Sequence, residues 1–159
     1  MHWHTPTSIG VLDVDMDGHL DIVCGTVTGV FTGDILYFHN DDPATFDIAY
    51  NRKVDTSGPV QCMTVGDFGG DPREDIAIGW REHTGGYAGG VSIYYTDLGT
   101  IPLTGVDPSG GYAVNWCAAL TVDHFNYGIY PGYYGPMLMD LAAGVKSSPT
   151  DAAILLFIR

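Results

Sequence analysis

Positive charge is scarce in this sequence. Its 159 residues include 6 Lys and Arg against 19 Asp and Glu, which gives a formal net charge of -13. Phosphate groups and anionic membrane surfaces are bound by clustered cations, so neither nucleic acid nor a membrane is expected as a partner. Glutamate is scarce too, because Glu74 and Glu82 are the only two. The resulting excess of aspartate is typical of turns and of compact metal loops with oxygen ligands.

Several other signals are missing. No apolar run approaches the roughly 18 residues that membrane insertion needs. No secretory leader follows Met1, which leaves open an intracellular protein, a removed leader or an excised piece. The cysteines Cys24, Cys62 and Cys117 lack C-x-x-C spacing, so common zinc and redox motifs are not supported. Each lies in an apolar strand-like run, which favours buried free thiols over a disulfide.

What the sequence does contain is an internal repeat. The segment Val11–Gly25 aligns with Val65–Gly79, and a third copy starts at Val122 and resumes at Met139. The leading aspartates of the three copies are spaced 54 and 56 residues apart: Asp13, Asp67 and Asp123. In each copy a second aspartate is followed four residues later by glycine: Asp21 and Gly25, Asp75 and Gly79, Asp140 and Gly144. The third copy differs by a nine-residue insertion between its two aspartates.

Each repeat predicts a strand, an acidic loop, a second strand, a turn and a third strand. The first strands are expected at residues 8–12, 60–65 and 114–122, the second at 20–24, 75–79 and 138–144, and the third near 35–38, 91–95 and 154–157. A fourth strand is expected at 46–54 in the first repeat and somewhere in 100–112 in the second. No segment shows sustained helical periodicity.

A period near 50 with four strands per unit is typical of a β-propeller blade. We therefore predict a single all-β domain over residues 1–159, made of about three four-stranded propeller-type blades at approximately 1–56, 57–110 and 111–159. Three blades form a partial propeller, and the last is incomplete unless another chain completes it. The chain is then part of a larger propeller or a homo-oligomer; an open stack of small sheets is the alternative.

The first acidic loop has the pattern of a calcium site. Its predicted ligands are the carboxylates of Asp13, Asp15, Asp17 and Asp21 and the backbone carbonyl of His19. Calcium takes six to eight oxygens in flexible geometry, and Gly18 permits a sharp turn. An EF-hand is excluded because its twelfth position, a bidentate glutamate, is Cys24 here. The alternative is an acidic β-turn that binds no ion.

The second loop predicts a weaker calcium site, because Gly69 replaces one carboxylate. Its expected ligands are Asp67, Asp71, Asp75 and the backbone carbonyl of Arg73. The insertion in the third loop does not favour a third ion. That insertion contains four tyrosines, which either form a contact surface for a protein or glycan or pack on their own blade: Tyr127, Tyr130, Tyr133 and Tyr134.

At these loops the chain resembles the FG-GAP/VCBS repeat family, to which the integrin α-chain propeller belongs. The resemblance lies in residues 11–25 and 65–79, including the Phe68-Gly69 pair, and in the aromatic strand ending at Tyr37-Phe38 that leads to Asn40. It implies propeller blades with calcium in the loop between the first two strands of a blade. It also implies an extracellular or cell-surface location.

Three functions are compatible with these patterns. The first is a calcium-stabilised, non-catalytic binding, adhesion or scaffolding module with a protein or glycan partner. The second is a self-assembling structural subunit of a filament or surface layer, completed by strand exchange. The third is the propeller part of a calcium-dependent carbohydrate-active enzyme such as a polysaccharide lyase. The enzyme is disfavoured because cations do not cluster near the acidic loops and no nucleophile or nucleotide-binding motif is present. We therefore expect no catalytic residues.

Overall fold

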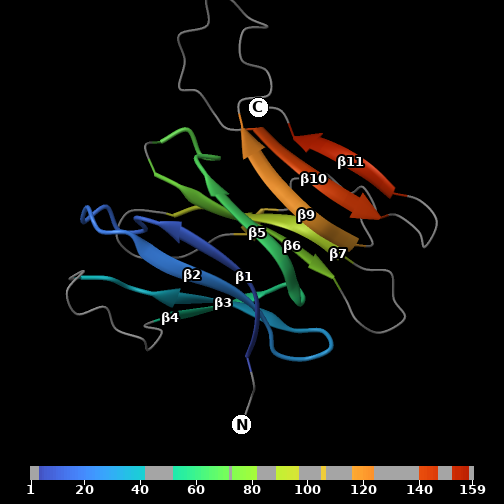
Figure 1. The fold of residues 1–159 in the computed structure, drawn as a ribbon, viewed down its shortest axis with the longest axis horizontal. Helices are drawn as coiled ribbons and strands as arrows, with labels where there is room; N and C mark the ends of the chain where they lie inside the picture. Colours follow the sequence, from blue (N-terminus) through green and yellow to red (C-terminus); the bar gives the residue numbers. More distant parts are fainter. Residues whose placement is uncertain are drawn as a thin grey trace, which may run out of the picture.

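The residues that the structure describes fold into three small antiparallel sheets (Figure 1). The computed structural model describes residues 4–41, 52–71, 73–81, 89–96, 105–106, 116–123, 140–146 and 152–157. Over these residues the prediction of an all-β chain is confirmed, because every regular element among them is a strand. Also within these ranges, no helix has the length and apolar composition that crossing a membrane requires.

The first sheet has the strand order β1-β2-β3-β4 and comprises Thr5–Leu12, Asp21–Val27, Gly33–Phe38 and Arg52–Thr56. The second has the order β5-β6-β7-β8 and comprises Val60–Gly66, Asp75–Arg81, Gly89–Tyr94 and the two-residue Gly105–Val106. The third has the order β11-β10-β9, with β9 at Trp116–Asp123, β10 at Asp140–Lys146 and β11 at Ala152–Phe157. Strands that are consecutive in the chain are therefore neighbours in each sheet.

The fourth strand of the first sheet lies later than the sequence indicated. It was expected at residues 46–54, but β4 spans Arg52–Thr56, and residues 42–51 lie outside the described ranges. Its register explains the difference, because Thr56 pairs with Gly33 and Arg52 pairs with Tyr37. Val54 is the residue of this strand that packs toward the core, so β4 itself carries no apolar run that could have marked it.

The three first strands share an irregularity that the sequence did not reveal. A register shift falls between Pro6 and Ser8 in β1 and between Val60 and Cys62 in β5. The corresponding shift in β9 falls where β10 passes from Gly144 to Val145. A bulge bends its strand and increases the local twist. The three sheets therefore repeat the same backbone distortion at the same place, in addition to their strand order.

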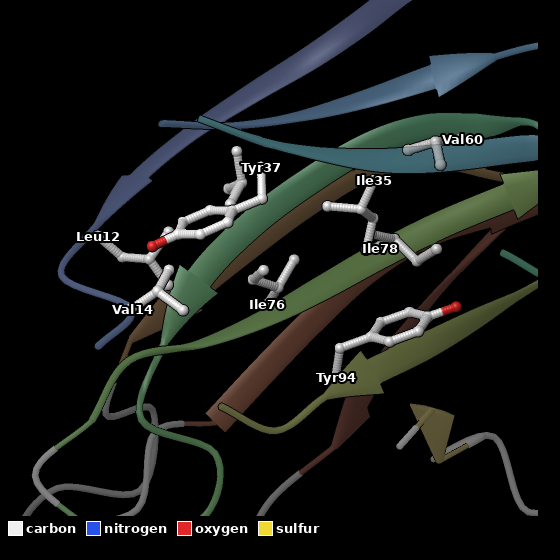
Figure 2. Close-up of a cluster of buried hydrophobic side chains, with 9 residues drawn as sticks. Leu12, Val14, Ile35, Tyr37, Val60, Ile76, Ile78 and Tyr94 are labelled. Atoms are coloured by element: carbon white, nitrogen blue, oxygen red, sulfur yellow. The ribbon is translucent and has the colours of Figure 1, made fainter. Parts of the chain in front are cut away.

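The sheets pack in series, with the second sheet between the other two. A first core joins the first and second sheets, and Figure 2 shows side chains from both sheets pointing into it. Its fully or almost fully buried members include Leu12, Ile35, Val60 and Ile78. Each such side chain stabilises the fold by about 1.5–3 kcal/mol relative to an exposed one. A second core joins the second and third sheets: Phe68, Ala77, Val91, Ile93, Cys117, Leu141, Ala143 and Val145.

Glycine makes the close approach of the sheets possible. A Cβ at Gly25 of β2 would lie 2.5 Å from Val60 Cγ1 of β5. A Cβ at Gly79 of β6 would lie 2.6 Å from the Sγ atoms of both Cys62 and Cys117. These two sulfur atoms are 3.9 Å apart, and both cysteines are free thiols. In the first two sheets, the glycine four residues after the second aspartate thus lies against the first strand of the next sheet.

We predict that Gly79→Ala destabilises the protein by about 1–3 kcal/mol, because the new methyl group overpacks the second core. Urea unfolding measures this loss. In a Cys62→Ala/Cys117→Ala background the cost of Gly79→Ala should be smaller, since both overlapping sulfur atoms are then gone. An equal cost in the two backgrounds would show that the sulfur contacts are not its cause.

Candidate metal centre

The first acidic loop connects β1 to β2 and is shaped by its own carboxylates. Asp13 accepts hydrogen bonds from the backbone N–H groups of Asp17, at 3.2 Å, and Gly18, at 2.9 Å. Two residues adopt the left-handed conformation that closes the turn, Met16 with φ of 63° and Gly18 with φ of 90°. Gly18 tolerates this conformation at no steric cost, whereas a residue with a side chain such as Met16 rarely adopts it.

Three predicted ligands of this loop come together. Asp13, Asp15 and Asp17 each offer a carboxylate oxygen, and these three atoms all lie within 4.8 Å of one another. Two oxygens bound to one calcium ion at 2.6 Å are separated by at most about 5.2 Å, twice the bond length. The spacing of the three oxygens therefore fits a single calcium ion. Each side chain is exposed or half-buried, so solvent ions have access to the loop.

Asp21 is the fourth predicted carboxylate ligand of this loop. Its side chain also links the loop to the core through hydrogen bonds. It is fully buried, and its Oδ2 accepts hydrogen bonds from the Val14 backbone N–H and the Tyr37 hydroxyl, both at 3.0 Å. Its Oδ1 accepts a third from the Asn40 backbone N–H at 2.8 Å. Burial and then the charge of Asp21 raise the pKa of Tyr37 well above its usual range, which keeps this hydroxyl a donor.

Asp75 makes the equivalent contacts in the second sheet. Its Oδ2 accepts a hydrogen bond from the Phe68 backbone N–H at 3.0 Å, and its Oδ1 accepts one from the Thr96 backbone N–H at 2.9 Å. Burial raises the pKa of Asp75, while the bonds from the N–H groups of Thr96, Phe68 and Gly69 oppose that rise. The corresponding Asp140 of the third sheet is also fully buried.

In the first two sheets, the residue two positions after the third strand completes this link from the other side. The Asn40 side-chain amide donates to the Leu20 carbonyl at 3.1 Å, just before Asp21. The Thr96 hydroxyl likewise donates to the Glu74 carbonyl at 2.8 Å, just before Asp75. Sequence reasoning missed Asn40 and Thr96 as site residues. The available signal was a hydrogen-bonding side chain two positions after the aromatic end of the third strand in the first two repeats.

His39 is a further site residue that sequence reasoning missed. Its Nε2 lies 2.6 Å from an Asp15 carboxylate oxygen and its Nδ1 lies 3.1 Å from Asp41. Burial lowers the pKa of His39, but the charges of Asp15, Asp21 and Asp41 outweigh this and raise it. His39 also joins Asp15 and Asp21, and separately Asp17 and Asp41, in groups able to hold a metal ion. An ion bound by Asp15 would therefore compete with His39 or recruit it.

The second loop is arranged differently. Asp67 accepts a hydrogen bond from the Gly70 N–H at 2.6 Å, and Asp71 accepts one from the Arg73 N–H at 2.9 Å. In the part of the chain that the structure describes, the groups of three potential metal ligands all come from residues 13–21 and 39–41. Asp67, Asp71 and Asp75 are not brought together in such a group, and a second ion stays a prediction, as do the carbonyl ligands of His19 and Arg73.

The two acidic loops lie at the same end of the sheets. The guanidinium Nε of Arg73 in the second loop approaches the Met16 sulfur of the first at 3.0 Å, and its Nη1 donates to the Thr96 carbonyl at 3.3 Å. The described residues thus place both loops on one shared surface. The predicted contact surface of the third repeat lies outside the described residues: Tyr127, Tyr130, Tyr133 and Tyr134.

Comparison of the chain with models of protein families gives no match, and comparison with curated proteins gives no relative.

We predict that Asp21→Ala costs at least about 3 kcal/mol with metal chelated, because three donors lose their acceptor and a buried donor without a partner costs about 1–3 kcal/mol. Tyr37→Phe should cost only about 1 kcal/mol, since it removes one of the three bonds. Asp13→Ala is the matched control and should cost less than Asp21→Ala, because its bonds are exposed. Urea unfolding in EDTA ranks the three variants, and equal losses for Asp13→Ala and Asp21→Ala would contradict the structural role.

Proposed function

We propose that this protein is a calcium-stabilised, non-catalytic module of FG-GAP/VCBS-type propeller repeats that binds or scaffolds a protein or glycan partner outside the cell or at its surface. The observation that carries the proposal is the cluster of Asp13, Asp15 and Asp17, whose oxygens lie within 4.8 Å of one another in a loop between the first two strands of a sheet. Calcium prefers oxygen ligands of this kind.

The repeated architecture supports the propeller part of the proposal. The first strands of the sheets are neighbours in order, with β1 contacting β5 and β5 contacting β9. Two sheets have four strands in sequential order, as a propeller blade does. The shared bulge and the shared buried aspartate indicate that the sheets are copies of one unit. In a propeller, such copies pack side by side around an axis with their first strands adjacent.

The exposure of the first loop supports the location. Asp13, Asp15 and Asp17 lie at the surface, and the loop is only partly fixed by hydrogen bonds among its own residues. Accessible, adaptable sites of this kind fall in the affinity range of extracellular calcium modules, with Kd of about 0.1–1 mM. Such a site fills where calcium is millimolar. Its role is then to hold the loop, and with it the surface shared by the two acidic loops, in one conformation.

Calcium titration tests the proposal. We expect saturating calcium to raise the unfolding free energy by about 2.7 kcal/mol at a hundredfold excess over Kd, with magnesium much less effective. Asp15→Ala and Asp17→Ala should abolish most of this gain. Asp55→Ala is the control, because Asp55 lies on β4 and pairs with Lys53 at 2.6 Å. Asp41 is unsuitable as a control, since it contacts His39. No stabilisation by calcium, or equal effects of all three variants, would overturn the proposal.

The second loop provides a gain-of-function prediction. Gly69 stands where the first loop has Asp15, and a Cβ at Gly69 would lie 3.3 Å from the Asp75 carboxylate. Gly69→Asp should therefore destabilise the protein in EDTA through repulsion between the two carboxylates. In calcium it should recover and show tighter binding at the second loop, because the ion gains a ligand. Calorimetric titration of Gly69→Asp against the parent measures both effects, and unchanged calcium binding would exclude a second site of the predicted form.

A further inference from the structure

The three sheets present equivalent faces to one another. We call the side that packs on the following sheet the forward face of a sheet, and the opposite side its rear face. The forward face of the first sheet includes the paired residues Val23 and Tyr37 and the pair Gly25 and Ile35. The forward face of the second sheet includes the corresponding pairs Ala77 with Ile93 and Gly79 with Val91. In both sheets these faces are buried against the next sheet.

The third sheet carries the same forward face, and no other sheet among the described residues packs on it. Its corresponding pairs are Ala142 with Leu156 and Gly144 with Ile154. Ile154 is 75% exposed and Leu156 is 56% exposed, whereas Ile35 and Val91 at the position of Ile154 are 1% and 0% exposed. Among the described residues, a Cβ at Gly144 would meet only its own neighbour Ala119, at 3.7 Å. The space that the next sheet fills at Gly25 and Gly79 is therefore open at Gly144.

The first strand β1 carries the matching rear face. In β5 the rear face consists of Val60, which fills the space at Gly25, and of Met63 and Val65, which approach Gly10. The shared bulge aligns these three residues with Pro6, Ile9 and Val11 of β1. All three are exposed, Ile9 by 65% and Val11 by 47%.

We infer that a second copy of this chain docks head to tail, with the rear face of its β1 on the forward face of the third sheet. Within the chain, a forward face packs on a rear face twice, between the first and second sheets and between the second and third. The exposed forward face of the third sheet and the exposed rear face of β1 are the same two kinds of surface, so a second copy can supply the matching face. The seven residues named above on the two faces are uncharged: Ala142, Gly144, Ile154 and Leu156 on one side, and Pro6, Ile9 and Val11 on the other. Their apolar character favours burial.

A head-to-tail junction is heterologous, so it closes into a ring or continues as a filament. Two copies that close would contain six sheets, within the range of four to eight that propellers have. The net charge of -13 per chain opposes association, so added salt should strengthen it. The inference goes beyond the proposed function and does not depend on it, because the seven residues named on the two faces include none from the first two acidic loops.

Sedimentation velocity over a range of concentrations tests the junction, in EDTA and in calcium. The parent chain should associate, and Ile154→Glu or Ile9→Glu should weaken association by at least about tenfold, because a charge is then buried without a partner. Phe31→Glu is the matched control, since Phe31 is 53% exposed in the turn between β2 and β3, outside both faces. Circular dichroism checks that each variant keeps its strands. Association in EDTA without any calcium effect would support the junction and defeat the calcium proposal.

Mixing the two variants distinguishes this junction from other contacts. Ile9→Glu retains a normal third sheet and Ile154→Glu retains a normal β1, so an equimolar mixture should form a one-to-one dimer although neither variant associates alone. A mixture that stays monomeric would overturn the inference. So would a parent chain that is monomeric at every concentration, or a loss of association in Phe31→Glu equal to that in Ile154→Glu.

Discussion

A buried aspartate at the start of the second strand is the constraint on which the acidic loops depend. Removing a carboxylate from water is costly unless donors replace the water. Asp21 has three such donors, from the loop start, the third strand and the residue beyond that strand. Asp75 repeats two of these contacts. The core thus sets where each loop leaves and re-enters its sheet, and an ion would act on a loop whose ends are already fixed.

The same loops show how one sequence pattern serves two purposes. Asp13, Asp15 and Asp17 remain at the surface with their oxygens close together, whereas Asp21 turns inward although its spacing also suits a ligand. The surface carboxylates and the buried carboxylate contribute differently to stability. Mutual repulsion among surface carboxylates is screened by water and salt, while a buried carboxylate depends on its hydrogen bonds. Removal of an ion bound among the surface carboxylates would therefore loosen the loop without dismantling the sheet beneath it.

Much of this arrangement could be predicted from the spacing of residue types within short stretches of the sequence. The rest depends on contacts between residues that lie about twenty positions apart in the chain. The repeat, the strands and the cluster around Asp15 follow from local pattern. The roles of Asn40, Thr96 and His39 do not, because these residues reach the loops only after the chain has passed through two further strands. The shared bulge was equally hidden, since no residue type marks it. The position of β4 was hidden as well, because it pairs with β3 over Arg52–Thr56, where Val54 is the one apolar residue.

The connectivity of the sheets has a consequence for how the chain acquires its structure. Each described strand bonds to strands adjacent to it in the chain, so each sheet forms by joining consecutive strands, without a connection that crosses to another sheet. Topologies dominated by such local pairing fold faster than those that join distant segments. Each sheet then gains its stability mainly from the neighbour on which it stacks, as in other repeat architectures. The middle sheet, enclosed on both sides, should exchange its amide hydrogens most slowly, and the two outer sheets should open first.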